Sequence, residues 1–386
     1  MQGSSTITNC KAGKGGGVHV SGGTFKMQDS AIVTPSTGSE QYTAGKNDVY
    51  LTSGKTITVD STLTSTDPVA RITPQSYTEN TPVLTGTITG GSPQNYTKFT
   101  VTPQKVTVGS ENGKIFWYIS ATGLLKAEVE DLQTLKEAVT AAPADNTPFV
   151  IKLGNIDDLQ TVQIPGNKKI MLKADNASKP AILKCPKKDP NGHKHLQVNR
   201  DATLILEGLI TLQGTDYKGN TQYALYVENR GKAEIKDGVT ITGFKNYNVT
   251  SNGVEQAGKG PVFVDGTLTM SGGTIKENTV VNDATVWSGG GGGGVYVGAT
   301  GNFIMKGGTI TGNKAKRGGG VYVKGQFTME GGTITKNKAN TDGKAVMLNH
   351  YFYWQGGEIK DNQEGSGSVI GGSGYYFSNT SGNTAS

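Results

Sequence analysis

The sequence predicts an all-β solenoid, and three observations in its C-terminal half carry this prediction. A segment recurs: GGGVYV begins at Gly292 and again at Gly318, and the related step from Met305 to Met329 is 24 residues. Within each copy apolar and polar residues alternate, which is the period of a strand buried on one side. Glycine pairs and triplets separate the strands and favour sharp corners. A unit of 24–25 residues cannot bury its apolar side alone, so copies must stack, about 4.8 Å per layer.

The strands of one coil follow from its alternation. Val321 and Val323 share one face of a strand with Tyr322 opposed, and Phe327 and Met329 share one face of the next. A third strand follows around the Ile of the pattern F-x-M-x-G-G-T-I-x-x-N. Four segments carry this pattern or a variant of it: 268–278, 303–313, 327–337 and 352–362. The sequence therefore predicts a parallel β-helix with three short strands per coil.

The Asn that ends each pattern occupies the same place in every coil. A side-chain amide both donates and accepts hydrogen bonds, so a stack of amides can bond along the solenoid axis. We expect a structural ladder here rather than a ligand site. Its members are Asn278, Asn313, Asn337 and Asn362.

These repeats resemble the right-handed parallel β-helix proteins of the pectin-lyase-like superfamily. Their Gly-Gly and x-x-Asn spacing also resembles the repeats of polymorphic outer-membrane proteins and related bacterial adhesin passengers. The resemblance covers about a third of the chain and implies a right-handed parallel β-helix solenoid. It is specific for architecture and not for activity, because that fold carries lyases, hydrolases and inert stalks alike.

Composition narrows the class of protein. The 57 Gly residues and the 34% hydrophobic content would suggest disorder, but the glycines fall at strand corners and the apolar residues fall in register. The net charge is +6 with scattered Lys, which indicates no nucleic-acid partner and leaves anionic glycans as candidates. We expect no transmembrane segment and no signal peptide, because no run of 18 apolar residues exists and the first residues lack an apolar stretch. Abundant Thr, Gly and Asn favour an exported bacterial protein, at the cell surface, outer-membrane-associated or secreted.

The N-terminal part already contains a coil. Residues 7–20 match residues 310–323 with an offset of 303, and the match continues to Ile32 and Ile334 after a one-residue slip. The offset puts Cys10 where the ladder residue Asn313 stands. We therefore expect residues 1–92 to be the end of a β-helix segment and residues 93–125 to be a hairpin-like linker around SENGK. An uncapped coil exposes its open face, so this segment is either a fragment or a surface for head-to-tail self-association.

The main parallel β-helix is expected over residues 126–386, with a capping helix near residues 131–142. Leu132, Leu135 and Val139 fall at helical spacing, Asp131 is a plausible N-cap, and Pro143 is a stop. In proteins of this resemblance, a helix leading into the first strand covers the first coil.

The sequence shows no catalytic cluster, and we expect no cofactor and no metal site. Polysaccharide lyases of this resemblance need carboxylates for Ca²⁺ and a basic residue, and the hydrolases need paired Asp on adjacent coils. The acidic candidates are isolated in sequence and favour solvated surface or turn positions. They are Glu234, Asp237, Asp265 and Asp283.

Four further residues are surface candidates. His193 and His195 share one side of an extended segment with Asp189 nearby, but the Pro and Gly around them favour a surface loop over metal binding. Tyr296 and Tyr322 occupy equivalent outward positions and could form an aromatic strip, which usually stabilises cross-strand packing and can bind sugars where basic residues flank it.

The leading interpretation is a non-enzymatic bacterial cell-surface or secreted repeat protein, an adhesin-like stalk or a surface that binds a glycan or a host or surface protein. The alternative is a polysaccharide lyase or glycoside hydrolase of the pectin-lyase-like superfamily. Acidic side chains from successive coils that converge in one groove would favour the enzyme.

Overall fold

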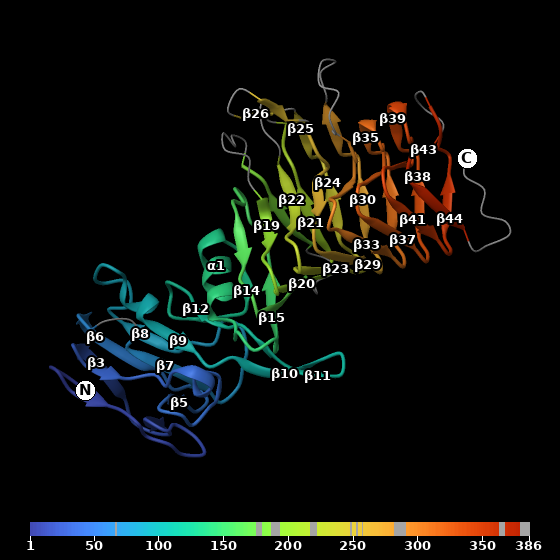
Figure 1. The fold of residues 1–386 in the computed structure, drawn as a ribbon. Helices are drawn as coiled ribbons and strands as arrows, with labels where there is room; N and C mark the ends of the chain where they lie inside the picture. The colour runs from blue at the N-terminus through green and yellow to red at the C-terminus, as the bar shows by residue number, and fades with distance from the viewer. Residues whose placement is uncertain are drawn as a thin grey trace. The chain divides into compact units, whose positions relative to one another are not determined.

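The computed structural model describes residues 1–65, 68–174, 180–186, 194–216, 222–247, 249–251, 254–256, 258–281, 291–362 and 367–378. The chain divides into two compact units, Met1–Glu128 and Val129–Ser386. Strands dominate both units (Figure 1). In the described part of the chain, no helix has the length and apolarity that crossing a membrane requires.

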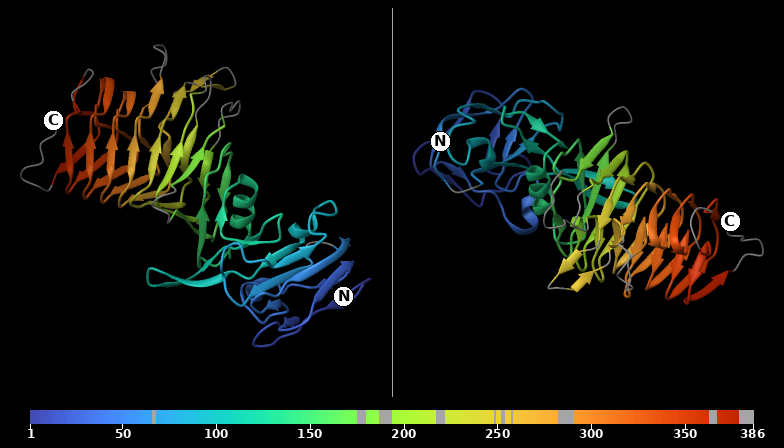
Figure 2. Two further views of the ribbon diagram at one scale, coloured as in Figure 1. Left: turned by 180° about the vertical axis from the view of Figure 1, so that it is seen from behind. Right: turned by 90° about the horizontal axis from the view of Figure 1, so that it is seen from above.

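The second unit is a parallel β-helix, so the predicted fold class is confirmed. Its coils run through three parallel sheets, in which each strand pairs with its counterparts in the coils before and after it (Figures 1 and 2). Sheet 1 contains β16 (Val162–Ile164), β19 (Lys194–Val198), β22 (Tyr223–Val227), β28 (Val262–Val264), β32 (Val295–Val297), β36 (Val321–Val323), β40 (Val346–Leu348) and β43 (Ile370–Gly372).

The other two long sheets follow sheet 1 in each coil. Within the second unit, sheet 2 contains β15 (Pro148–Leu153), β17 (Lys169–Ala174), β20 (Thr203–Gly208), β23 (Lys232–Ile235), β29 (Thr267–Met270), β33 (Asn302–Met305), β37 (Gln326–Met329), β41 (Tyr351–Trp354) and β44 (Tyr375–Ser378). Sheet 3 contains β18 (Ala181–Lys184), β21 (Ile210–Gln213), β24 (Thr240–Thr242), β30 (Thr274–Lys276), β34 (Thr309–Thr311), β38 (Thr333–Thr335) and β42 (Glu358–Lys360).

Some coils contain a fourth strand that the sequence pattern did not predict. These strands form sheet 4: β25 (Lys245–Tyr247), β31 (Thr279–Val281), β35 (Lys314–Arg317) and β39 (Lys338–Asp342). Ala315 and Ala339 are the buried residues of the last two strands. A single small apolar residue among lysines gives little alternation, which explains why this strand was missed. A short antiparallel pair, β26 (Val249–Ser251) and β27 (Val254–Gln256), completes the unit.

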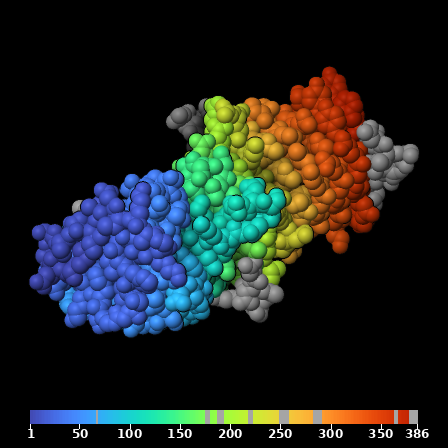
Figure 3. Space-filling model, turned by 90° about the horizontal axis from the view of Figure 1, so that it is seen from below, coloured from blue at the N-terminus to red at the C-terminus, as the bar shows by residue number. Residues whose placement is uncertain are grey.

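Like residues stack in columns inside the solenoid. Phe303, Phe327 and Phe352 lie on successive coils with ring centroids 4.9 and 4.7 Å apart and nearly parallel planes. These rings are fully buried, and Met305 and Met329 form a second buried column beside them. In Figure 3 the side chains of successive coils form bands of colour from yellow to red. The core of this unit is therefore a set of axial stacks, built one coil at a time.

A glycine with positive φ begins the corner that leads into sheet 1, and in two coils two further glycines follow it, at 292–294 and 318–320. Gly292, Gly318 and Gly343 have positive φ angles of 70°, 62° and 65°. A Cβ on Gly318 would lie 2.5 Å from the carbonyl oxygen of Val321, so a side chain would clash with the backbone as well as strain it.

The second unit begins with the helix that the sequence predicts. Helix α1 (Leu132–Ala141) is capped by Asp131, whose side chain accepts a hydrogen bond of 2.8 Å from the amide of Thr134. Its face of Leu135, Ala138 and Val139 is buried. At its C-terminal end the Lys168 ammonium donates to the carbonyl oxygens of Val139 and Thr140.

The first unit is built largely of short parallel sheets. Its parallel pairs and sheets are β1 (Thr6–Ile7) with β4 (Ile32–Val33); β2 (Val18–Val20), β5 (Val49–Leu51), β7 (Ala70–Pro74) and β9 (Phe99–Val101); and β3 (Phe25–Asp29), β6 (Ile57–Leu63) and β8 (Leu84–Gly86). Its remaining elements are the antiparallel pairs β10 (Gln104–Val108) with β11 (Glu111–Ile115) and β12 (Tyr118–Ile119) with β13 (Leu125–Lys126), the strand β14 (Glu128–Val129), and the 3-10 helices η1 (Gly38–Tyr42) and η2 (Asn95–Lys98).

Candidate functional site

The four asparagines of the repeat lie in one fully buried column between sheets 3 and 4. The Nδ2 of Asn278 donates to Oδ1 of Asn313 at 3.0 Å, and the Nδ2 of Asn313 donates to Oδ1 of Asn337 at 3.0 Å. Asn337 continues the column to Oδ1 of Asn362 at 3.2 Å. The main-chain amide of each donor residue bonds to the same oxygen, so one side chain serves two donors.

The column leaves these amides little capacity for a ligand. Each Nδ2 also donates to a main-chain carbonyl of an earlier coil, as from Asn313 to Ile275 and from Asn337 to Ile310, both at 2.9 Å. An amide nitrogen has two donors and its oxygen two acceptor sites, and both are used in Asn313 and Asn337. The geometry assigns the ladder to axial cohesion of the coils.

A second column lies on the outward face of sheet 1. The rings of Tyr226, Phe263, Tyr296 and Tyr322 stack at centroid distances of 4.8, 5.4 and 5.3 Å, with planes within 9° of parallel. Met347 continues the register beyond Tyr322, and Tyr223 contacts Phe263 edge-on. We call Tyr226, Phe263, Tyr296 and Tyr322 the aromatic column.

The expected solvent exposure of Tyr296 and Tyr322 is wrong. Their side chains point away from the main core, as the alternation predicts, yet they are only 3% and 1% exposed. The glycine-rich corner explains this burial: a Cβ on Gly291 would lie 2.7 Å from Cδ2 of Tyr322, so the corner packs directly against that ring. The Tyr322 hydroxyl also accepts a hydrogen bond from Asn349. Alternation in the sequence predicts the side of a strand on which a side chain lies, but it does not predict whether another segment covers that side chain.

Three lysines line the aromatic column. The Lys194 ammonium lies 3.8 Å from the ring centroid of Tyr226. Lys259 lies 4.8 Å from that of Phe263 and 5.3 Å from that of Tyr296, and Lys324 lies 5.9 Å from that of Tyr296. Such distances are those of cation–π contacts. All three lysines are half-buried, so their ammonium groups lie where apolar surface meets solvent.

The pKa values of this face are shifted by burial. Burial lowers the pKa of Lys259, with Lys324 adding to the shift and Asp265 opposing it. Burial raises the pKa of Asp265, although Lys259 and Lys194 partly offset the rise. Burial also raises the pKa of Tyr296 to about 12. A desolvated lysine beside a desolvated carboxyl group is the kind of environment that clusters at functional sites.

The remaining candidates are scattered. His195 is not on a surface loop as expected: it lies in β19, is 1% exposed, and its Nδ1 contacts the carbonyl oxygen of Leu159. Glu234 accepts a hydrogen bond from Ser271, and Asp237 is exposed. His193 and Asp283 lie outside the described residues. Of the acidic candidates among the described residues, Asp265 is the one whose charge acts on Lys259 and Tyr296.

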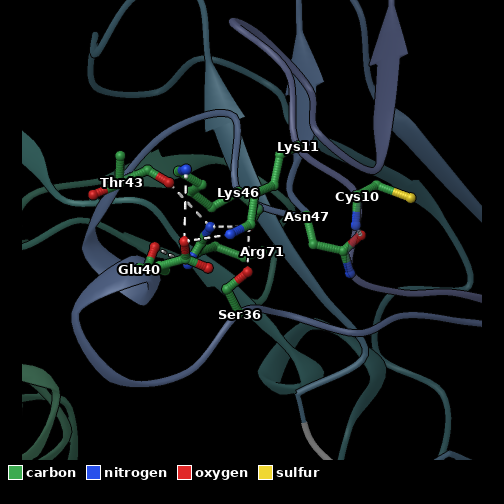
Figure 4. Close-up of polar contacts among 8 residues, drawn as sticks. All are labelled: Cys10, Lys11, Ser36, Glu40, Thr43, Lys46, Asn47 and Arg71. Carbon is green, nitrogen blue, oxygen red and sulfur yellow. Dashed lines mark hydrogen bonds and ion pairs between the residues drawn. The ribbon is translucent and has the colours of Figure 1, made fainter.

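The first unit contains a buried polar cluster of its own (Figure 4). Arg71 is 2% exposed, and its guanidinium donates to the carbonyl oxygens of Glu40 and Thr43 at 3.2 and 3.1 Å and to that of Lys46. These carbonyls belong to the loop around η1. The Glu40 carboxylate pairs with the ammonium groups of Lys11 and Lys46 at the surface. The buried Arg71 guanidinium therefore holds the backbone of this loop in place.

Sequence reasoning missed Lys194, Lys259 and Arg71. Lys194 is 32 residues from Tyr226 along the chain, whereas Lys259 precedes Phe263 by four residues, and neither lysine occupies a repeated position. Arg71 precedes Ile72 in an ordinary strand pattern, which gives no sign that its side chain is buried. Lys324 follows Tyr322 by two residues in sequence and is a basic residue close to the predicted aromatic strip.

Within the described ranges, no group of three or more His, Cys, Asp or Glu side chains could hold a metal ion. Comparison with protein-family models, with curated proteins and with solved structures finds no match for this chain.

Proposed function

We propose that this chain is a non-enzymatic repeat protein of the bacterial surface, a stalk that binds anionic glycans on the outward face of sheet 1. The observation that carries the proposal is the row of Lys194, Lys259 and Lys324 along the aromatic column. The resemblance of the repeats to adhesin passengers and to the pectin-lyase-like superfamily supports a cell-surface, outer-membrane-associated or secreted location.

The chemistry of the row favours an anionic sugar. Because the rings of Phe263, Tyr296 and Tyr322 are buried and that of Tyr226 is half-buried beneath Lys194, a ligand would meet the lysine heads rather than the ring faces. A carboxylate or sulfate group near Lys259 restores the charge interactions that this ammonium loses through burial. Lysines on different coils present charge along the solenoid axis, which suits a linear polymer better than a single small anion.

The internal columns support the role of a stalk. Every coil from Asn278 to Asn362 is joined to the next by hydrogen bonds between Asn side-chain amides and by stacked rings or methionines. Such a solenoid holds its outward side chains at a constant spacing, because each coil contacts only its neighbours and repeats their geometry.

Calorimetric titration of the full chain with sulfated heparin-derived and polygalacturonate hexasaccharides tests the binding face. We expect binding that weakens as salt rises from about 0.05 to about 0.5 M, since the contacts are charged and partly exposed. Lys259→Ala should weaken binding about fivefold, which is ~1 kcal/mol. The matched control is Lys105→Ala, an exposed lysine of the first unit. Equal binding by both variants would contradict the proposal.

The location is tested on intact cells of the source bacterium. An antibody against the chain should label unpermeabilised cells, or detect the chain in the medium, and mild external protease should remove the cell-bound signal. Labelling that requires permeabilisation would contradict a surface or secreted location.

The Lys259 and Asp265 pair favours a second candidate function, cleavage of an acidic polysaccharide by β-elimination. Lys259 would remove the proton beside a uronate carboxyl group, and the Asp265 carboxyl group would hydrogen-bond to that carboxylate; burial shifts the pKa of each group toward its neutral form. The leaving sugar oxygen would take up a proton from solvent water, an unsaturated uronate would remain, and Lys259 would return its proton to the solvent. Incubation with pectin, alginate and glycosaminoglycans, followed by absorbance of unsaturated uronates and assay of new reducing ends, separates this function from binding alone.

A further inference from the structure

The outward face of sheet 2 carries a group of aromatic rings that is distinct from the aromatic column. In the parallel pair β41 and β44, Tyr351 lies beside Tyr375 and Tyr353 lies beside Phe377. Ring centroids are 5.5 Å apart in the first pair and 5.3 Å apart in the second, and Tyr351 and Tyr353 are 6.2 Å apart along the strand. We call these four rings the C-terminal patch.

This patch is accessible, unlike the aromatic column. Tyr375 is 64% exposed and Phe377 is 48% exposed, while Tyr351 and Tyr353 are half-buried. The edge of His350 lies against Tyr351 at a centroid distance of 4.1 Å and fixes that ring on one side. Single exposed apolar residues are normal on protein surfaces, but a contiguous group of aromatic rings marks an interaction site.

Charge changes along the same face of sheet 2. Outward positions on the early strands β17, β20 and β23 are largely charged: Lys169, Lys173, Glu207, Lys232 and Glu234. One residue beyond Met305 and Met329, Lys306 and Glu330 still form an ion pair at 3.9 Å. From β29 to β44 the two outward rows that contain the rings are uncharged: Thr267, Thr269, Asn302, Ile304, Gln326, Thr328, Tyr351, Tyr353, Tyr375 and Phe377. The rings therefore adjoin amides and hydroxyls, without ionic groups in these rows.

We propose that the C-terminal patch binds a neutral saccharide, as a second site separate from the lysine row of sheet 1. The apolar C–H faces of a sugar ring pack against aromatic rings, and its hydroxyls need partners that both donate and accept hydrogen bonds. Three tyrosine hydroxyls and the exposed amide of Gln326 supply such partners. Rings fixed by sheet pairing lose little side-chain entropy on binding, which favours a weak ligand of this kind.

The area of the patch favours a saccharide over a protein partner. A fully accessible aromatic side chain offers about 200 Å², so the exposed parts of the four rings add to about 300 Å². A standard protein interface buries about 800 Å² on each partner. The two rows that contain the rings also carry no charged side chain that would orient a protein partner.

The test is calorimetric titration of the full chain with cellohexaose, β-1,4-mannohexaose and laminarihexaose, beside polygalacturonate hexasaccharide. We expect at least one neutral hexasaccharide to bind with an affinity that does not change with salt. Tyr351→Ala and Tyr375→Ala should each weaken that binding about fivefold, the range of a lost aromatic contact. Phe377→Tyr keeps the ring and should change the affinity less than about twofold.

Two results would overturn this inference. One is the absence of binding by all three neutral saccharides, or binding that the alanine variants leave unchanged. The other is concentration-dependent self-association that Tyr375→Ala abolishes, which would make the patch an interface between copies. Lys259→Ala should leave neutral-saccharide binding intact, so failure at one face is distinguishable from failure at the other. Circular dichroism and a melting curve check that each variant is folded.

Discussion

The two units share one type of backbone corner, at Asn313 in the second unit and at Cys10 in the first, but different side chains stabilise it. In the second unit, the amide of Asn313 donates to Oδ1 of Asn337 at 3.0 Å; in the first, the amide of Cys10 donates to Oδ1 of Asn47 at 3.2 Å. Nδ2 of Asn337 donates to the carbonyl oxygen of Ile310, and Nδ2 of Asn47 donates to that of Ile7. The same 303-residue offset relates Cys10 to Asn313 and Ile7 to Ile310.

The difference lies in what completes each corner. A thiol cannot replace the amide group of Asn313, so the axial chain of side-chain amides is interrupted at Cys10. Near it, the first unit has two buried charged groups instead. Asp48 accepts hydrogen bonds from the amides of Gly16 and Gly45 at 2.8 and 3.0 Å, and Arg71 holds the loop around η1. The comparison teaches that the glycine corner determines the backbone conformation in both units. The contacts that hold neighbouring segments together can come from a ladder of neutral Asn side chains or from buried charged groups such as Asp48 and Arg71.

One of the two largest expected effects is the loss of Arg71. Arg71→Met should destabilise the first unit by about 3 kcal/mol, because three loop carbonyls on half-buried residues lose a charged donor. Hydrogen exchange measured by mass spectrometry should show faster exchange over residues 38–46 and unchanged exchange in the second unit. Lys105→Met, at an exposed site, is the control. Unchanged exchange over the loop would mean that Arg71 does not hold it.

The next effect compares the two ladders directly. Asn337→Ala should cost about 3 kcal/mol, because two donors of Asn313 lose an acceptor in a fully buried site. Asn47→Ala should cost about 2 kcal/mol, since Oδ1 of Asn47 accepts one hydrogen bond from Cys10, from its main-chain amide, where Oδ1 of Asn337 accepts two from Asn313. Urea unfolding followed by segment-resolved hydrogen exchange measures both.

Asn340→Ala, an exposed asparagine of β39, is the control for the ladder variants and should be nearly neutral. If Asn337→Ala and Asn47→Ala lower the free energy of unfolding equally, the hydrogen bond between neighbouring side-chain amides adds no stability beyond the hydrogen bonds from the main-chain amides.

A third effect should be the same in both units. Gly15 and Gly318 have φ angles of 58° and 62°, and a Cβ on either would lie within 2.5 Å of a carbonyl oxygen three residues later. Gly15→Ala and Gly318→Ala should each cost about 2 kcal/mol in thermal or urea unfolding. Gly23 has a φ of 60°, and a Cβ added there would have no atom within 4 Å, so Gly23→Ala isolates the backbone term at about 1 kcal/mol. A smaller cost at Gly15 than at Gly23 would contradict a shared corner.

Sequence reasoning reached the repeated features that large apolar side chains or a recurring Asn mark, and it missed a repeated strand that has neither. The period and the alternation predicted the stacked strands, because each coil needs the same residue type at the same place. Asn278 to Asn362 and the Phe303 column follow from that rule. The fourth strand was missed because Ala315 and Ala339 are too small to mark a buried face.

The candidate site was harder to predict for a physical reason. Tyr296 and Tyr322 were placed on the correct side of their strand, but the fold of the glycine corner over Tyr322 has no periodic signature. Lys194 reaches the aromatic column from an earlier coil than Tyr226, and Lys259 reaches it from the segment just before Phe263. The burial that shifts the pKa of Lys259 and Asp265 is a property of the assembled face, and no short stretch of sequence contains it.

The smallest expected effect repairs the interruption at Cys10. Cys10→Asn would place an amide beside Oδ1 of Asn47, which already accepts from the Cys10 main chain. Since Cys10 is only partly buried, the gain should be about 0.5 to 1 kcal/mol, the net value of one hydrogen bond. Cys10→Ala removes the thiol without adding an amide and should show no gain. If Cys10→Asn and Cys10→Ala unfold at the same urea concentration, the ladder in the first unit depends on main-chain donors alone. A gain that disappears in the background of Asn47→Ala would instead show that the new amide bonds to Asn47, as Asn313 bonds to Asn337.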